Sequence, residues 1–205
     1  MKIFGFNVPD NPIATNGAVV LMAGLFFAAV YRANRHEAGP MPQIFSLIAA
    51  HDADGVRSAV EQNHDLLKAV DLDGSTPLDV ALQEGDQPLI DFLLDSGADV
   101  NARNNNGITP LFFAISSKNK QDQPATLTKL LDHGADPNLR LPDGTHLLHI
   151  LAAQCKATDP RLLLVLNKVP DHPAIRDSKG RTPADIADAS GHHAAADWLR
   201  LRIHD

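Results

Sequence analysis

Residues 71–81 read DLDGSTPLDVA, and this stretch decides the fold. An Asx-Gly pair supplies a positive φ angle at low steric cost, so Asp73 and Gly74 predict a tight hairpin, here termed a finger. The hydroxyl of Thr76 can cap the next helix, and Pro77 suits the first helical position because no N–H is needed there. The stretch therefore predicts a finger followed directly by a short helix.

The same stretch recurs along the chain. Glycines stand in matching contexts at positions 74, 107, 144 and 180, which are 33, 37 and 36 residues apart. Three of them are followed by Thr-Pro, at Thr76–Pro77, Thr109–Pro110 and Thr182–Pro183. Self-similar units with a period in the thirties indicate a solenoid, because such short helices are stable only when neighbouring units stack.

Each unit is expected to contain a second helix. Pro88, Pro124 and Pro160 suit its first turn, and apolar residues with helical spacing follow the first two. Gly97 and Gly134 stand two residues beyond these apolar stripes, where a left-handed C-terminal cap is expected.

These residues resemble the ankyrin repeat family. Asp71–Ala81 matches the family's turn followed by T-P-L-H-x-A, with Asp79 in the His position. Leu93–Asn101 (LLDSGADVN) and Leu130–Asn138 (LLDHGADPN) are similar to the family's helix end and finger, and Gly180–Ala187 (GRTPADIA) is a weaker copy. The resemblance implies an all-α helical repeat solenoid. We expect an N-terminal capping unit at 43–70, repeats at 71–103 and 104–140, a degenerate repeat at 141–176 and a C-terminal capping repeat at 177–205.

The third unit departs from the family pattern. His146-Leu147 replaces Thr-Pro, and residues 167–173 (NKVPDHP) replace the Gly-Ala-Asp ending, so we expect an irregular finger there. Residues 117–123 and 156–159 exceed the family's usual connection between helices and are expected to bulge.

The N-terminal residues predict a membrane segment. No charged side chain occurs from Asn11 to Tyr31, and about twenty residues in a helix match the roughly 30 Å hydrocarbon thickness of a bilayer. We expect a tail at 1–12, a single transmembrane helix at 13–33 that contacts the lipid bilayer, and a linker at 34–42. A buried helix and a cleaved signal peptide are the alternatives. The count of basic residues slightly favours a cytoplasmic solenoid and leaves a periplasmic one open.

Charge and composition narrow the function. The net charge is −7 and the sequence pI about 5.7, which argues against nucleic acid as a partner because phosphate binding needs clustered Lys and Arg. Residues 52–99 hold twelve acidic side chains against Arg57 and Lys68, a net charge of −10. This asymmetry indicates either a solvated face or the steering of a basic partner. The Ala- and Asp-rich, Lys-poor composition suggests a bacterial source.

The sequence contains few residues that could form a catalytic or metal site. His146 and His149 are three apart, but the resemblance gives His149 a structural position, and no Cys or Glu stands at ligand spacing. The single cysteine, Cys155, lies in an apolar stretch that favours a buried structural thiol over a nucleophile. We therefore predict a non-catalytic protein without cofactor or metal; the alternative is a metal-dependent or hydrolytic enzyme that uses the solenoid's concave face.

The resemblance implies that another protein binds at the finger tips and at the concave ends of the first helices. The predicted contact residues are Leu72, Asp73, Ser75, Gln83, Glu84, Asn105, Asn106, Ile108, Ser116, Ser117, Pro142, Asp143, Thr145, Lys179 and Arg181. Leu72, Ile108 and Leu141 are apolar residues in polar fingers, so each is expected either to contact a partner or to pack on a neighbouring finger. An inhibitor, such as an immunity protein against a membrane-acting toxin, and a scaffold both fit this prediction.

Overall fold

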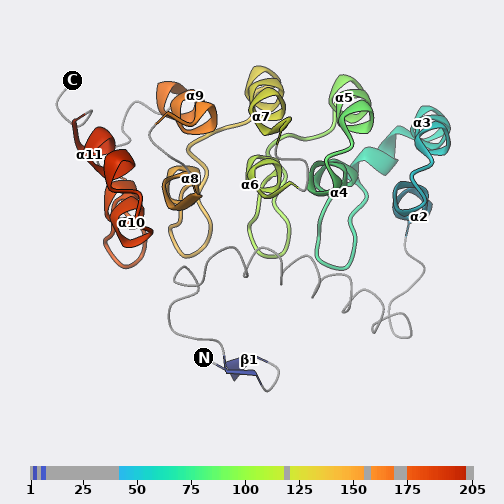
Figure 1. Ribbon diagram of the computed structural model, residues 1–205. Helices are drawn as coiled ribbons and strands as arrows, with labels where there is room; N and C mark the ends of the chain where they lie inside the picture. The colour runs from blue at the N-terminus through green and yellow to red at the C-terminus, as the bar shows by residue number, and fades with distance from the viewer. Residues whose placement is uncertain are drawn as a thin grey trace.

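The computed structural model describes residues 2–3, 6–7, 42–117, 121–154, 158–168 and 175–201. Its helices stack side by side in two rows, and loops project from the lower row (Figure 1). The lower, inner row contains α2 (Gln43–Ala49), α4 (Pro77–Glu84), α6 (Pro110–Ser116), α8 (Leu147–Gln154) and α10 (Pro183–Ala189). The outer row contains α3 (Ala53–Gln62), α5 (Gln87–Asp95), α7 (Gln123–Asp132), α9 (Pro160–Lys168) and α11 (His193–Leu201).

Besides the α-helices, the described residues contain few regular elements. The 3-10 helix η1 (His64–Lys68) follows α3. Two-residue strands, β1 (Lys2–Ile3) and β2 (Phe6–Asn7), pair antiparallel, and a single bridge joins Arg140 to His146. The predicted all-α repeat solenoid is thus confirmed over the stacked helices.

The predicted single-pass membrane localisation is corrected here. Among the described residues, no helix is long and apolar enough to cross a membrane. The longest, α3 and α7, have 10 residues each, or about 15 Å at a rise of 1.5 Å per residue, half of the hydrocarbon thickness. The predicted helix at 13–33 lies outside the described residues.

The Thr-Pro pairs begin three inner helices, as expected, but the caps differ. Thr76 accepts a hydrogen bond from the N–H of Asp79, and Asp79 accepts one from the N–H of Thr76; Thr182 and Asp185 form the same capping box. Thr109 makes no such cap, and its hydroxyl is buried without a partner. The prediction was wrong at Thr109: the N–H of Phe112 donates to the carbonyl of Thr109 (2.9 Å) and not to its hydroxyl, and Phe112 has no side-chain acceptor that could complete a capping box.

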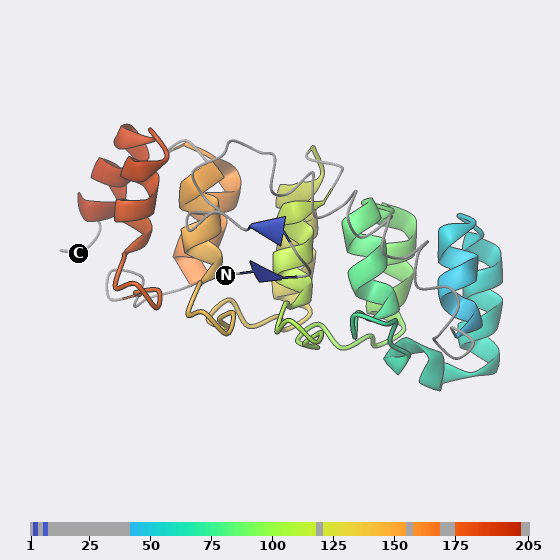
Figure 2. The ribbon, with the colours of Figure 1, turned by 90° about the horizontal axis from the view of Figure 1, so that it is seen from below.

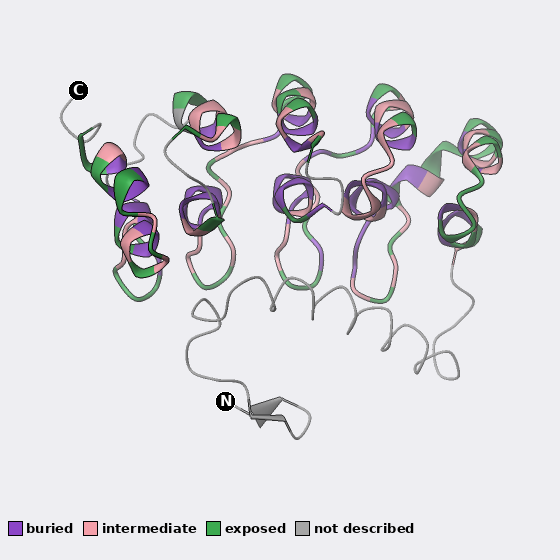
Figure 3. Cartoon of the chain, viewed as in Figure 1, coloured by how far each residue is buried: buried purple, intermediate pink, exposed green. Residues whose placement is uncertain are grey.

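The core lies between the two rows of helices. Buried residues make up most of the inner helices and the inward side of the outer helices, whereas exposed residues lie on the outward side of the outer helices and at the finger tips (Figure 3). The apolar stripes predicted for the second helices are largely buried, as in Ile90, Leu93, Leu127 and Leu130, each with no exposed surface. Neighbouring units share this core, since α4 contacts both α2 and α6, and α8 contacts α10. No unit buries its apolar face alone, as a solenoid requires.

Candidate protein-binding surface

Four fingers extend from the inner helices and lie next to one another along one edge of the stack (Figure 2). They comprise residues 70–75, 103–108, 140–145 and 176–181, numbered first to fourth below. Each contains a glycine with a φ angle between +73° and +77°, the left-handed conformation that glycine adopts without strain. The predicted Gly turns therefore give four fingers of similar shape, including the one in the third unit.

A side chain at the start of the finger holds three of the four turns. One carboxylate oxygen of Asp71 accepts hydrogen bonds from the N–H groups of Asp73 (2.9 Å) and Ser75 (2.8 Å). Asn104 and Asp177 accept from the corresponding N–H groups of their own fingers. The third finger has Leu141 at this position and uses Asp143 to accept from the N–H of Thr145 (2.9 Å) instead.

Backbone hydrogen bonds join neighbouring fingers. The N–H of Asn105 donates to the carbonyl of Asp73 (2.9 Å), and that of Ser178 donates to the carbonyl of Asp143 (3.0 Å). Pro142 occupies the corresponding position of the third finger and has no N–H to donate. This backbone hydrogen bond therefore joins the first finger to the second and the third finger to the fourth. It does not join the second finger to the third.

Arginines just before the turns add a second set of contacts. The Nη1 atom of Arg103 donates to the carbonyls of Gly107 (3.2 Å) and Arg140 (2.9 Å). Arg140 donates to the carbonyl of Arg176 (3.3 Å), and Arg176 to that of Gly180 (2.8 Å). Arg103 and Arg140 therefore each bridge to the next finger.

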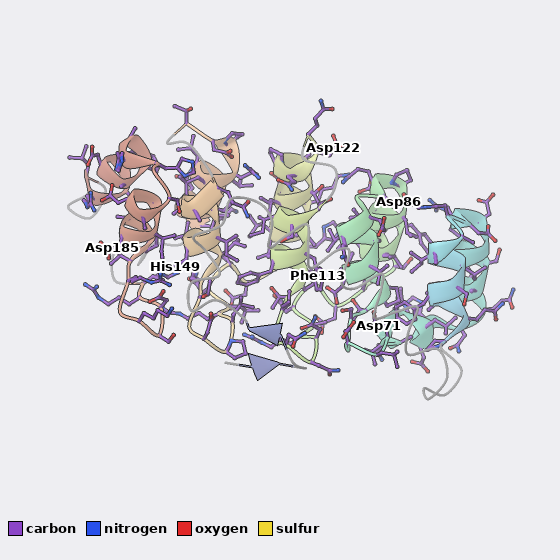
Figure 4. The ribbon with its side chains drawn as sticks, turned by 60° about the horizontal axis from the view of Figure 1, so that its bottom comes forward. Asp71, Asp86, Phe113, Asp122, His149 and Asp185 are labelled. Carbon is purple, nitrogen blue, oxygen red and sulfur yellow. The ribbon has the colours of Figure 1, made fainter. Side chains whose placement is uncertain are left out.

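His146 and His149 form the cap of α8. The Nδ1 atom of His146 accepts from the N–H of Leu148 (3.0 Å), and the Nδ1 atom of His149 accepts from the N–H of His146 (3.1 Å). His149 lies on the side of α8 near the fourth finger, where its Nε2 atom is 3.0 Å from the carbonyl of Arg181 (Figure 4). Burial lowers the pKa of both imidazoles, that of His146 to about 4. Neutral histidines thus replace the Thr-based cap.

Asp79 of α4 occupies the position that His149 has in α8. One of its carboxylate oxygens accepts from the N–H (2.8 Å) and the hydroxyl (2.9 Å) of Thr76. The other, Oδ1, is buried without a hydrogen-bond partner. Burial raises the pKa of Asp79 to about 7, although the hydrogen bonds from Thr76 act against this shift.

The predicted contact residues fall into three groups by exposure. Exposed ones are Leu72, Asn105, Asn106, Ser116, Pro142, Asp143 and Lys179. Half-buried ones are Asp73, Gln83, Glu84, Ile108, Thr145 and Arg181. Ser75 and Ser117 are buried, with 4% and 7% of their surfaces exposed, so they do not belong to an accessible surface. Sequence spacing places a residue in a finger or at a helix end but does not give its orientation.

The apolar finger residues behave differently from one another. Ile108 and Leu141 are half-buried and pack against the core, whereas Leu72 has 49% of its surface exposed. Val70, which is not among the predicted contact residues, is 50% exposed. A sequence signal for it existed, because Val70 stands where the other fingers have arginine.

Several predictions concern ligand chemistry. Among the described residues, no group of three or more His, Cys, Asp or Glu side chains could hold a metal ion. His146 and His149 are the residues of the alternative metal-site hypothesis. Three of their four ring nitrogens make the hydrogen-bond contacts described above. Cys155 and most of the degenerate ending at 167–173 lie outside the described residues, as do residues 118–120 and 156–157 of the predicted bulges.

Paired helices and a row of bonded fingers define a helical repeat solenoid. Residues 44–139 match the family model described as ankyrin repeats in three copies. Residues 44–139 of the chain are thus ankyrin repeats, and the resemblance found in the sequence is confirmed.

Curated relatives have the same repeats. ADP-ribosylation factor GTPase-activating protein AGD4 of Arabidopsis thaliana is 33% identical over 133 residues, or 60% of this chain and 17% of that protein. AGD2 of the same plant, with the same description, is 38% identical over 95 residues, 46% of this chain and 12% of that protein. Cyclin-dependent kinase inhibitor 2A of Monodelphis domestica is 34% identical over 76 residues, 37% of this chain and 43% of that protein. The match thus spans under a fifth of each plant relative.

Proposed function

We propose that this chain is a non-catalytic protein that binds a partner protein through its fingers and the adjoining ends of its inner helices. The main support for this proposal is the row of fingers. Hydrogen bonds between fingers hold polar tips from successive units in fixed positions, as in the contact of Asn105 with Asp73. A rigid surface of this kind loses little conformational entropy when a partner binds.

The partner is proposed to be basic. Asp71 and Asp73 lie in the first finger and Glu84 ends the adjoining helix α4, within the segment of net charge −10. Complementary charge accelerates encounter and selects against acidic competitors. Asp86 and Asp99 lie in the same unit and extend the acidic region.

Within this function, inhibitor and scaffold are two proposed roles. One relative is named a cyclin-dependent kinase inhibitor, and the names of two others describe GTPase-activating proteins. An inhibitor, for instance an immunity protein that neutralises a toxin, blocks the activity of what it binds. A scaffold leaves that activity intact, so an activity assay on the bound partner distinguishes the two roles.

A comparative pull-down tests the proposal. The full chain serves as bait beside a variant with Asp71→Lys, Asp73→Lys and Glu84→Lys, and beside a control with Asp54→Lys, Glu61→Lys and Asp132→Lys. The control also reverses three charges, but these belong to exposed residues of the outer helices: Asp54 and Glu61 of α3, and Asp132 of α7. A basic protein captured by the wild type and the control but lost by the first variant is the expected result. Equal capture by all three baits at low salt would contradict the proposed surface.

A further inference from the structure

The first finger differs from the other three just before its turn. Arg103, Arg140 and Arg176 occupy this position in the later fingers, and each donates to backbone carbonyls there. The first finger has Val70, which has no side-chain donor and has 50% of its surface exposed. An exposed aliphatic residue thus replaces a structural arginine at this one place in the row.

Leu72 lies in the first finger, at the end of the finger row. Asn105 and Ser178, at the same position in later fingers, donate their N–H groups to the finger before them. The unit before the first finger consists of α2, α3 and η1 and supplies no finger in the described structure. Among the described residues, no finger lies against the edge at which later fingers receive a neighbour, and the side chain of Leu72 is 49% exposed.

Val70 and Leu72 stand two residues apart in the same finger, and each has about half of its surface exposed. Val70, Leu72 and Leu201 are the exposed large hydrophobic residues of the described part of the chain, and two of the three lie in one finger. Leu201 lies at the far end of the stack, in the last turn of α11. Exposed apolar residues that cluster and are flanked by polar groups are typical of interaction sites.

Two carboxylates alternate with the apolar pair. Asp71 stands between Val70 and Leu72, and Asp73 follows directly. Burial and the negative charge of Asp71 raise the pKa of Asp73, so a cation placed near Asp73 would stabilise its charged form. The edge therefore combines aliphatic surface with negative charge.

We propose that this first-finger edge (Val70, Asp71, Leu72 and Asp73) binds an extended segment of a partner protein in which Lys or Arg adjoins an aliphatic residue. The inference rests on the proposed function and assigns the partner's contact segment. A carbonyl of the segment accepts from the N–H of Leu72, as Asp73 accepts from Asn105 in the row. The aliphatic side chain packs on Val70 and Leu72, and the basic one pairs with the carboxylates. A second copy of this chain would bring the same acidic edge, and like charges repel.

Selection from a random peptide library tests this chemistry. Twelve-residue peptides displayed on phage are selected on the immobilised full chain, and enriched sequences are synthesised and their dissociation constants measured by fluorescence anisotropy. We expect enriched peptides with Lys or Arg beside Leu, Ile or Val. Their binding should weaken at least tenfold in Val70→Arg/Leu72→Asn, because central apolar contacts dominate such interfaces. Leu201→Asn, which removes the third exposed hydrophobic residue, should change the constant less than twofold.

A charge variant and a folding check complete the test. Asp71→Asn keeps an acceptor for the turn, as Asn104 does in the second finger, and should weaken the same peptides more at low salt than at high salt. Circular dichroism melting must show all variants folded. Enrichment of acidic or uncharged peptides, no enrichment, or equal binding by Val70→Arg/Leu72→Asn would overturn the proposal. So would light scattering that shows a wild-type dimer abolished by this variant, because the occupant would then be a second copy.

Failure of this inference can be told apart from failure of the proposed function. If the protein captured by the wild type binds Val70→Arg/Leu72→Asn unchanged but is lost on reversal of Asp71, Asp73 and Glu84, the edge proposal fails and the proposed function stands. If neither variant affects capture, both fail.

Discussion

At the scale of single residues, the fingers depend on how closely they approach one another. Gly74 has a φ angle of +76°, and a Cβ atom added to it would lie 2.6 Å from the side-chain oxygen of Asn105. Gly97 has a φ angle of +84° with no heavy atom within 4 Å of such a Cβ. An alanine would be strained by the left-handed backbone at either position, but only at Gly74 would its Cβ atom also meet a neighbouring finger.

The first prediction compares these glycines. Gly97→Ala should cost about 1 kcal/mol from left-handed backbone strain alone. Gly74→Ala should cost about 2–3 kcal/mol, because the second finger must also move. Urea denaturation of both variants measures the difference, and equal losses would show that the fingers do not pack as described.

Asp79 predicts a dependence of stability on pH. Its pKa in the folded state is about 7, above the ordinary value of 3.8, so the folded chain holds this proton more tightly than the unfolded chain. The resulting stabilisation is complete below about pH 4 and is lost as the pH rises through 7. Asp79→Asn should therefore gain stability relative to the wild type between pH 5 and pH 8, on the order of 2 kcal/mol. Urea denaturation at both pH values tests this, and a constant difference would argue against a neutral Asp79.

His146 predicts the opposite dependence. Burial and the nearby His149 and Arg140 lower its pKa to about 4, so the unfolded chain binds the proton more tightly below pH 6.5. The stabilisation from the neutral imidazole is present above pH 6.5 and is lost as the pH falls toward 4. His146→Thr, which offers the cap used by Thr76 and Thr182, should lose less stability than the wild type between pH 7 and pH 5. Hydrogen exchange of the α8 amides would localise the effect, and parallel losses in both proteins would contradict it.

At the scale of elements, the arginine contacts explain how fingers stay in register. Arg103 reaches carbonyls in two fingers, whereas Val70 reaches none through its side chain. Val70→Arg should therefore stabilise the first repeat by about 0.5–1 kcal/mol if the guanidinium bonds the carbonyls of Gly74 and Arg103. Arg103→Met should destabilise by a similar amount. Thermal unfolding measures both, and a Val70→Arg variant less stable than the wild type would contradict the shared finger geometry.

Most elements could be predicted from the sequence because their signals are local. Asx-Gly turns and Thr-Pro starts depend on neighbours in the chain, so Gly74, Gly107, Gly144 and Gly180 all have the expected positive φ angles. Three features were not predicted, and their reasons differ. Ser75 and Ser117 are buried by contacts with residues distant in the chain. The hydroxyl of Thr109 makes no cap although Thr-Pro is present, and the exposure of Val70 could have been suspected from the arginines at its position in the other fingers. Local patterns do not contain the long-range contacts that bury Ser75 and Ser117.

At the scale of the whole molecule, charge and geometry converge on one end of the stack. Residues 52–99 have a net charge of −10, and the first finger, with the exposed side chains of Val70 and Leu72, lies within them. The fingers and inner helices face the same side, while the outer helices form the opposite side (Figure 1). A partner that binds by the proposed mode covers only the first of these two sides.

Hydrogen exchange of the full chain, free and bound to the captured partner, tests the central claim most directly. We predict that binding protects amides at 70–75 and 103–108 and at the C-terminal ends of α4 and α6, while α5, α7 and α9 stay unchanged. Protection confined to the outer helices, with the fingers unchanged, would contradict the account.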